Sequence, residues 1–70
     1  MSAFKDVKTL ANERDHFVAM SKIADKKLIL YTTAYGAESK QARVCRQEQS
    51  YYYDMVAERS IDLMRLRGDL

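Results

Sequence analysis

Two residue types that commonly do chemistry in proteins occur once each in this sequence, as His16 and Cys45. His16 follows Asp15, and a carboxylate that supports a histidine is a feature of general-base sites. Adjacent residues of a helix project about 100° apart, however, so these two side chains do not face each other. No nucleophile lies at a spacing that would complete a triad. We therefore interpret His16 as a surface residue and predict that the protein is not an enzyme.

Cys45 falls on an apolar helix face, where a thiol packs as a small hydrophobic group. Lys40, Arg43 and Arg46 lie near it in the sequence, and basic neighbours can activate a thiol, so redox or nucleophilic use is the alternative. One cysteine and one histidine allow no intramolecular disulfide and are too few for the usual structural zinc site. We therefore predict no cofactor, no metal and no catalytic residue.

A chain of 70 residues and 8.1 kDa is at most one small domain, which we place at residues 1–70. A monomer of this size buries only roughly 60% of the surface that its unfolded chain exposes, so a disulfide, a metal or a partner chain usually adds stability. Because the composition disfavours the first two, we expect a homo-oligomer. The absence of proline, the two glycines, and the 47% apolar and 31% charged residues are typical of a folded helical chain.

No apolar run in the sequence approaches the roughly 20 residues of a membrane span, and the first residues lack the apolar region of a signal peptide. A cysteine without a partner is typical of proteins in a reducing compartment. We therefore expect a cytoplasmic protein that does not bind membranes.

The residues from Ala37 to Arg67 are predicted to form one helix, because small and apolar residues recur at alternating steps of three and four. This heptad pattern consists of Ala42, Cys45, Tyr52, Val56, Leu63, Leu66 and Leu70. Further apolar and small residues lie beside it, so that almost half of the helix is apolar, and this width indicates contact with two neighbouring helices. The charged Arg59 falls within the pattern. It either bends towards solvent beside Asp62, or it is a charge that fixes the register of the helices or contacts an acidic partner.

A second heptad pattern lies upstream, at Leu10, Phe17, Ala24 and Tyr31, with Met20, Leu28 and Tyr35 at its flanks. Ser2 is the candidate N-cap of this helix, with Asp6 in its first turn. Gly36, near the midpoint of the chain, suits the left-handed position that commonly ends a helix. The sequence therefore predicts an all-α antiparallel hairpin with its turn at Gly36 and arms about 45 Å long.

Two helices cannot enclose a core of their own, so we expect two hairpins to form a four-helix bundle. The predicted dimer core consists of Leu10, Phe17, Leu28, Cys45, Tyr52, Val56, Leu63 and Leu66. Residues 28–35 are rich in β-branched and aromatic side chains, which favour a strand locally. An α-β-α chain whose strand at 28–35 pairs with that of a second chain is therefore the alternative fold, and it also requires a dimer.

The run Tyr51-Tyr52-Tyr53 is the most distinctive local feature. Three consecutive helical residues spread over about 200°, so they cannot all point into one core. Tyr51 projects away from the heptad pattern, as do Met55 and Val44, and tyrosine and methionine are enriched in protein interfaces. We therefore predict a protein-binding patch of Val44, Tyr51 and Met55. The preferred function is a non-enzymatic protein-interaction module, an adaptor, regulator or inhibitor, that acts as a helical dimer.

Charge is unevenly distributed: residues 20–46 carry a net charge of +4 and residues 47–70 a net charge of −2, although the whole chain carries only +2. A turn at Gly36 would bring six basic residues to one end of the hairpin, namely Lys22, Lys26, Lys27, Lys40, Arg43 and Arg46. Such a cluster could bind phosphates. A small nucleic-acid-binding regulator is therefore the alternative function.

Overall fold

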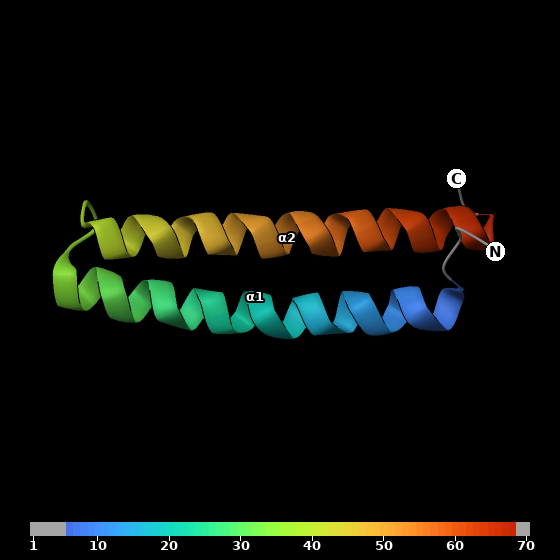
Figure 1. Ribbon diagram of the computed structural model, residues 1–70, viewed down its shortest axis with the longest axis horizontal. Coiled ribbons are helices and arrows are strands. Elements are labelled where there is room, and N and C mark those ends of the chain that lie inside the picture. The colour runs from blue at the N-terminus through green and yellow to red at the C-terminus, as the bar shows by residue number, and fades with distance from the viewer. Residues whose placement is uncertain (1–5, 69–70) are drawn as a thin grey trace.

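The computed structural model describes residues 6–68, which form two long antiparallel helices joined by a short turn (Figure 1). Helix α1 spans Val7–Tyr35 and helix α2 spans Lys40–Arg67. The predicted all-α hairpin with its turn at Gly36 is thus confirmed. The alternative with a strand at residues 28–35 is wrong, because this segment lies within α1.

The hairpin is a single layer of two helices, and its shape is correspondingly long. Its longest dimension is 46 Å, and its radius of gyration is 15.4 Å, whereas a compact chain of this length has a radius of about 11 Å. Its accessible surface of 5273 Å² exceeds the about 4500 Å² expected for a compact monomer of this mass. Within residues 6–68, neither helix has an apolar stretch long enough to cross a membrane.

Helix α1 begins at Val7 because Asp6 caps it. The Asp6 carboxylate accepts a hydrogen bond of 2.7 Å from the backbone N–H of Thr9, and this bond lowers the pKa of Asp6. Asp6 is therefore the N-cap and not a residue of the first turn. The earlier candidate for this role, Ser2, lies outside the described residues.

Both helices end at a glycine with a positive φ angle, but only Gly68 has left-handed helical angles, whereas Gly36, predicted to do so, has a ψ of 154°. Gly36 has a φ of +96°, and its N–H donates to the carbonyl of Thr32 at 2.9 Å. Gly68 has a φ of +80° and donates to the carbonyl of Arg65 at 3.1 Å. L side chains rarely adopt these backbone conformations, which explains why glycine stands at both positions.

Helix α2 begins at Lys40 and not at the predicted Ala37. The reason is Ser39, whose hydroxyl accepts a bond of 3.1 Å from the N–H of Ala42 and donates one of 2.7 Å to the carbonyl of Gly36. Ser39 therefore joins the end of one helix to the start of the next. The three residues before Lys40 belong to the turn.

The core is a narrow strip along the line where the two helices meet. Its buried residues are Leu10, Ser21 and Ala24 from α1 and Ala42, Cys45 and Leu63 from α2. Of the residues predicted for a dimer core, Phe17, Leu28, Tyr52 and Val56 are half-buried, and Leu66 remains 46% exposed. Most of the residues predicted for a dimer core thus pack, wholly or partly, within one hairpin.

A variant that lacks the α2 cap tests how much Ser39 contributes to the stability of the hairpin. We expect Ser39→Ala to lower the free energy of unfolding by about 1 kcal/mol, because the N–H of Ala42 loses its acceptor at the start of the helix. The measurement is urea denaturation followed by circular dichroism. Ser50→Ala is the matched control, since Ser50 is exposed in the middle of α2, where alanine favours the helix slightly. Equal losses in both variants would contradict the role of the cap.

Candidate protein-interaction face

Arg59 spans the gap between the helices and is held there by partners on both. Its Nε lies 2.9 Å from Oε1 of Glu13 on α1, and its side chain is only 17% exposed. Its guanidinium carbon lies 6.0 Å from the centre of the Phe17 ring. Asp62 on α2 is a further carboxylate, at 3.7 Å. Of the two interpretations of Arg59, the geometry therefore favours a charge that fixes the register of the helices.

A second polar contact between the helices lies nearer the turn and is centred on Asp25. The carboxylate accepts a bond of 2.6 Å from Nε2 of Gln49, and bonds of 2.9 and 2.8 Å from the Tyr53 hydroxyl. The bonds from Gln49 and Tyr53 lower the pKa of Asp25, and the bond to Asp25 raises the pKa of Tyr53. The heptad pattern alone does not show this cluster, because its members are 24 and 28 residues apart.

A third contact joins Lys27 on α1 to Glu48 on α2, with 3.0 Å between Nζ and Oε2. This hydrogen bond to Glu48, together with the charge of Glu48, raises the pKa of Lys27. The Asp25 and Lys27 contacts lie within one helical turn of each other, the Arg59 contact lies further towards the open end, and all require the same alignment of α1 with α2. They therefore specify the register that the narrow apolar strip alone specifies only weakly.

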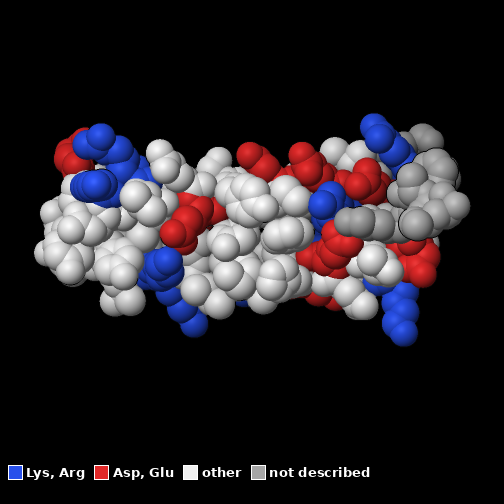
Figure 2. Space-filling view, viewed as in Figure 1, with Lys and Arg blue, Asp and Glu red and all other residues white. Residues whose placement is uncertain are grey.

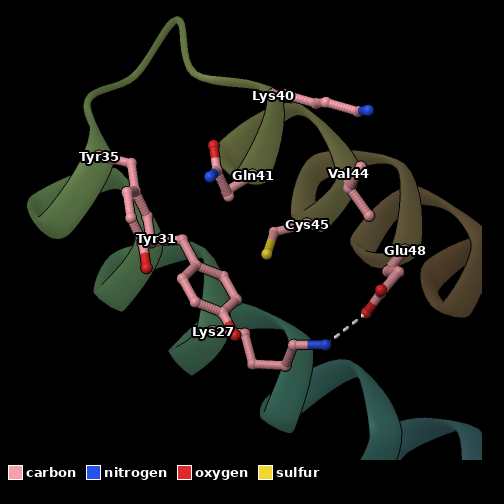
Figure 3. A pocket seen from close by; sticks show the side chains of 8 residues that line it. All are labelled: Lys27, Tyr31, Tyr35, Lys40, Gln41, Val44, Cys45 and Glu48. Carbon is pink, nitrogen blue, oxygen red and sulfur yellow. Dashed lines mark hydrogen bonds and ion pairs between the residues drawn. The ribbon is translucent and has the colours of Figure 1, made fainter.

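The ion pair of Lys27 and Glu48 lies at one end of a groove of about 420 Å³ between the helices near the turn (Figure 3). The groove is lined by Lys27, Tyr31 and Tyr35 from α1 and by Lys40, Gln41, Val44, Cys45 and Glu48 from α2. The sulfur of Cys45 points from α2 towards α1, whereas Lys40 points away (Figure 3). Besides the ion pair and the polar Lys40 and Gln41, the groove offers the aromatic and aliphatic surface of Tyr31, Tyr35 and Val44.

The predicted patch of Val44, Tyr51 and Met55 lies on the side of α2 that carries this groove. The three residues are separated by seven and four positions, so they share one side of the helix. Val44 lines the groove, and the ring of Tyr51 packs edge-on against that of Phe17, with 6.4 Å between ring centres. Val44 is 45% and Tyr51 53% exposed, whereas Met55 is half-buried. The structure therefore brings the three predicted residues together beside α1.

The same surface continues onto α1, which the sequence reasoning missed. Lys27, on α1, lines the groove, and three apolar residues lie at helical spacings from it. Met20 lies seven residues before Lys27, Ile23 four residues before it and Tyr31 four residues after it. These spacings place all three on the groove side of α1. Ile23 is 49% and Tyr31 38% exposed. We call the six residues Met20, Ile23, Tyr31, Val44, Tyr51 and Met55 the groove face. Figure 2 shows broad uncharged surface over the middle of the hairpin, between clusters of charged side chains.

The six basic residues predicted to bind nucleic acid do not form one cluster. Lys27 is paired with Glu48, while Arg43 and Arg46 donate to turn carbonyls at 3.3 and 2.8 Å. Helical spacing places Lys22 and Lys26 on the side of α1 that points away from α2. The sixth residue, Lys40, is exposed on α2. The positive charge near the turn is therefore divided between several surfaces, and two of its arginines hold the backbone of the turn.

The two residues of catalytic type lie apart from each other. His16 is exposed, with its ring 5.3 Å from that of Phe17, while Cys45 is a free thiol with only 2% of its surface exposed. Among the residues that the structure describes, no three histidine, cysteine, aspartate or glutamate side chains are grouped so that they could hold a metal ion. The packing interpretation of Cys45 accords with its burial.

Comparisons with protein-family models, with curated proteins and with solved structures find no match. The function of the chain is therefore inferred from the groove face and from the charged groups around it.

A double-mutant cycle tests the contact between Arg59 and Glu13. We expect Arg59→Gln and Glu13→Gln to be coupled by about 1 kcal/mol in the free energy of unfolding, because the two charges are largely shielded from water. The control is the cycle of Arg14→Gln with Asp15→Asn, whose ion pair of 3.2 Å lies on one helix and is more exposed. The coupling in the control cycle should be close to zero. A control coupling as large as that between Arg59 and Glu13 would contradict the proposal that the Arg59 contact fixes the register of the helices.

The pKa of Asp25 predicts a pH dependence of stability. Because folding lowers this pKa from its ordinary value of 3.8, the ionised form adds stability above that value, and the contribution is lost as the pH falls through the lower pKa of the folded state. Urea denaturation between pH 5 and pH 2 should therefore show a loss of stability that Asp25→Asn reduces. Asp54→Asn, at an exposed position of α2, should leave the slope unchanged. An unchanged slope in Asp25→Asn would exclude this role.

Proposed function

We propose that the chain is a non-enzymatic protein-interaction module that acts by burying its groove face against another polypeptide. The observation that carries this proposal is the imbalance between buried and exposed apolar side chains. Among the described residues, five apolar side chains are buried and twelve large ones are exposed. Four of the exposed ones, Ile23, Tyr31, Val44 and Tyr51, lie on the groove face. Contiguous exposed apolar surface of this kind is a feature of interaction sites.

The chemistry of the groove face suits recognition of a protein. Tyrosine offers a large apolar ring with a polar tip, and the flexible thioethers of Met20 and Met55 adapt to the shape of a partner. The apolar centre of this face, formed by Met20, Ile23, Tyr51 and Met55, lies between the ion pairs Lys27–Glu48 and Arg59–Glu13, with Tyr31 and Val44 beyond Lys27–Glu48 towards the turn. An apolar centre with a polar rim is the usual anatomy of a protein interface.

A dimer is part of this proposal. Domains are built from two or more packed layers, whereas this hairpin has one. A partner hairpin on the groove face would supply the second layer and complete a four-helix bundle.

Nucleic-acid binding has less support. Three of its six candidate residues have partners within the hairpin: Lys27 with Glu48, and Arg43 and Arg46 with the turn. It stays a prediction that fluorescence anisotropy with random DNA and RNA at two salt concentrations can test, since binding through phosphates weakens steeply with salt.

Replacement of Tyr51 tests the proposed function. We expect Tyr51→Ala to retain the helical circular dichroism spectrum, because this side chain is 53% exposed, but to lose capture of its main partner from a lysate of the source cells. Ile61→Ala is the control, since Ile61 is 41% exposed on α2 but is not part of the groove face. Equal capture by the wild type and Tyr51→Ala would argue against this surface.

A further inference from the structure

Four residues of the groove face, Met20, Ile23, Tyr51 and Met55, lie around the middle of the hairpin, whereas Tyr31 and Val44 lie nearer the turn. The midpoint of α1 is Ser21, which falls between Met20 and Ile23, and the midpoint of α2 falls between Tyr51 and Met55. A two-fold axis that crosses both helices at these midpoints would therefore place the apolar centre of one copy on the apolar centre of another. A surface that is placed symmetrically in this way is suited to contact with itself.

We infer that the polypeptide covering the groove face is a second copy of this chain, packed face to face with the two hairpins antiparallel. This inference rests on the proposed function, because it names the partner of the same surface. In this arrangement α1 lies over α1 of the second copy, α2 lies over α2, and the turn of each hairpin lies over the open end of the other.

The charged groups beside the groove face support this orientation. Lys27 lies about 9 Å from the midpoint of α1 towards the turn, and Glu13 lies about 12 Å from it towards the open end. On α2, Glu48 and Arg59 lie at equal distances on either side of the midpoint. The two-fold axis therefore brings Lys27 towards Glu13 of the second copy and Glu48 towards Arg59. Opposite charges meet at both ends of the apolar centre.

The charge of the whole hairpin distinguishes the antiparallel from the parallel arrangement. The half nearer the turn, residues 20–52, carries six basic and three acidic residues, and so has a net charge of +3. The other half, residues 6–19 and 53–68, carries five basic and six acidic residues, and so has a net charge of −1. Antiparallel packing places +3 over −1 twice, whereas parallel packing places the two +3 halves together. Electrostatic complementarity therefore favours antiparallel packing.

The hairpin has room for an interface of standard size, because its accessible surface is 5273 Å². A specific interface of standard size buries about 800 Å² on each partner. A second hairpin of the same length can cover this area along the 46 Å of the molecule.

Light scattering on the purified chain tests whether the second copy binds and by which face. We expect the wild type to have twice the mass of 8.1 kDa at micromolar concentration, and Ile23→Glu to have the monomer mass. Ile29→Glu is the matched control, because Ile29 is 67% exposed on the same helix but about 120° away around it. Circular dichroism checks that both variants remain helical. A wild type that stays at 8.1 kDa, or an Ile29→Glu variant that dissociates as Ile23→Glu does, would overturn the proposal.

Orientation is tested by a spin label at the turn, attached to Ala37→Cys in a Cys45→Ala background. Antiparallel hairpins place the two labels at a distance close to the 46 Å length of the molecule, whereas parallel hairpins place them side by side. A label at Ser50→Cys, near the middle of α2, should give a shorter distance and so show that the dimer is present. A short distance between the turn labels would overturn the antiparallel arrangement.

The two proposals fail in different ways. A monomeric wild type that captures another protein only when Tyr51 is present would remove the dimer, and with it the second copy as partner, but would leave standing the proposed binding of another protein by the groove face. A dimer that Ile23→Glu dissociates, and whose capture of other proteins does not depend on Tyr51, would support the second copy and reject capture through this face.

Discussion

Two helices touch along one line, and this geometric constraint determines most of what the hairpin is. Each helix can bury only a strip of side chains against the other, and the fully buried positions are filled mainly by small residues such as Ala24, Ala42 and Cys45. Small residues let the helices approach closely, but they remove little apolar surface from water. The larger apolar side chains, including Tyr51 and Ile23, therefore remain at the sides of the strip. The groove face is a direct result of this geometry.

A narrow apolar strip would allow one helix to slide along the other, and polar contacts oppose this. Asp25, Arg59 and Lys27 each have partners on the opposite helix, at distances that a shift of one turn would break. A half-buried charge is costly without its partner, so an incorrect register is disfavoured more strongly than the correct one is stabilised. The hairpin thus combines a narrow buried strip with a defined alignment. A defined alignment is also what keeps the six residues of the groove face together.

The spacing of the apolar residues was sufficient to predict the two helices, because steps of three and four persist over many turns. Gly36 was sufficient to place the turn. The segment 28–35 has local strand preference, yet it is helical, and its Ile29 and Leu30 are 67% and 65% exposed. The strand preference of this segment is outweighed by its position within a long helix that ends before Gly36. The start of α2 could not be predicted in the same way, because it depends on the capping bonds of Ser39.

The candidate site was predictable on α2 and not on α1. Val44, Tyr51 and Met55 stand out because they are apolar residues outside a clear heptad pattern. On α1 the pattern is less regular: Ser21 is buried, with its hydroxyl bonded to the carbonyl of Val18 at 2.7 Å, while the neighbouring Met20 lies at the side. Because a polar residue occupies the buried strip of α1, the sequence pattern does not show which apolar residues of α1 lie outside that strip. The partners of Arg59 and Asp25 were likewise hidden, because periodicity shows which side of a helix faces inward but does not show which residues meet.

The turn has a consequence for how the chain folds. The separation in sequence between residues that meet across the hairpin grows steadily from the turn to the open end, from 21 residues for Lys27 and Glu48 to 46 for Glu13 and Arg59. Contacts near the turn close the shortest loops, and each later contact then adds only a small further loss of chain entropy. Folding that starts at the turn and proceeds towards the open end is therefore the least costly route. The bonds from Arg43 and Arg46 to the turn carbonyls span only five and nine residues, so they close the shortest loops on that route.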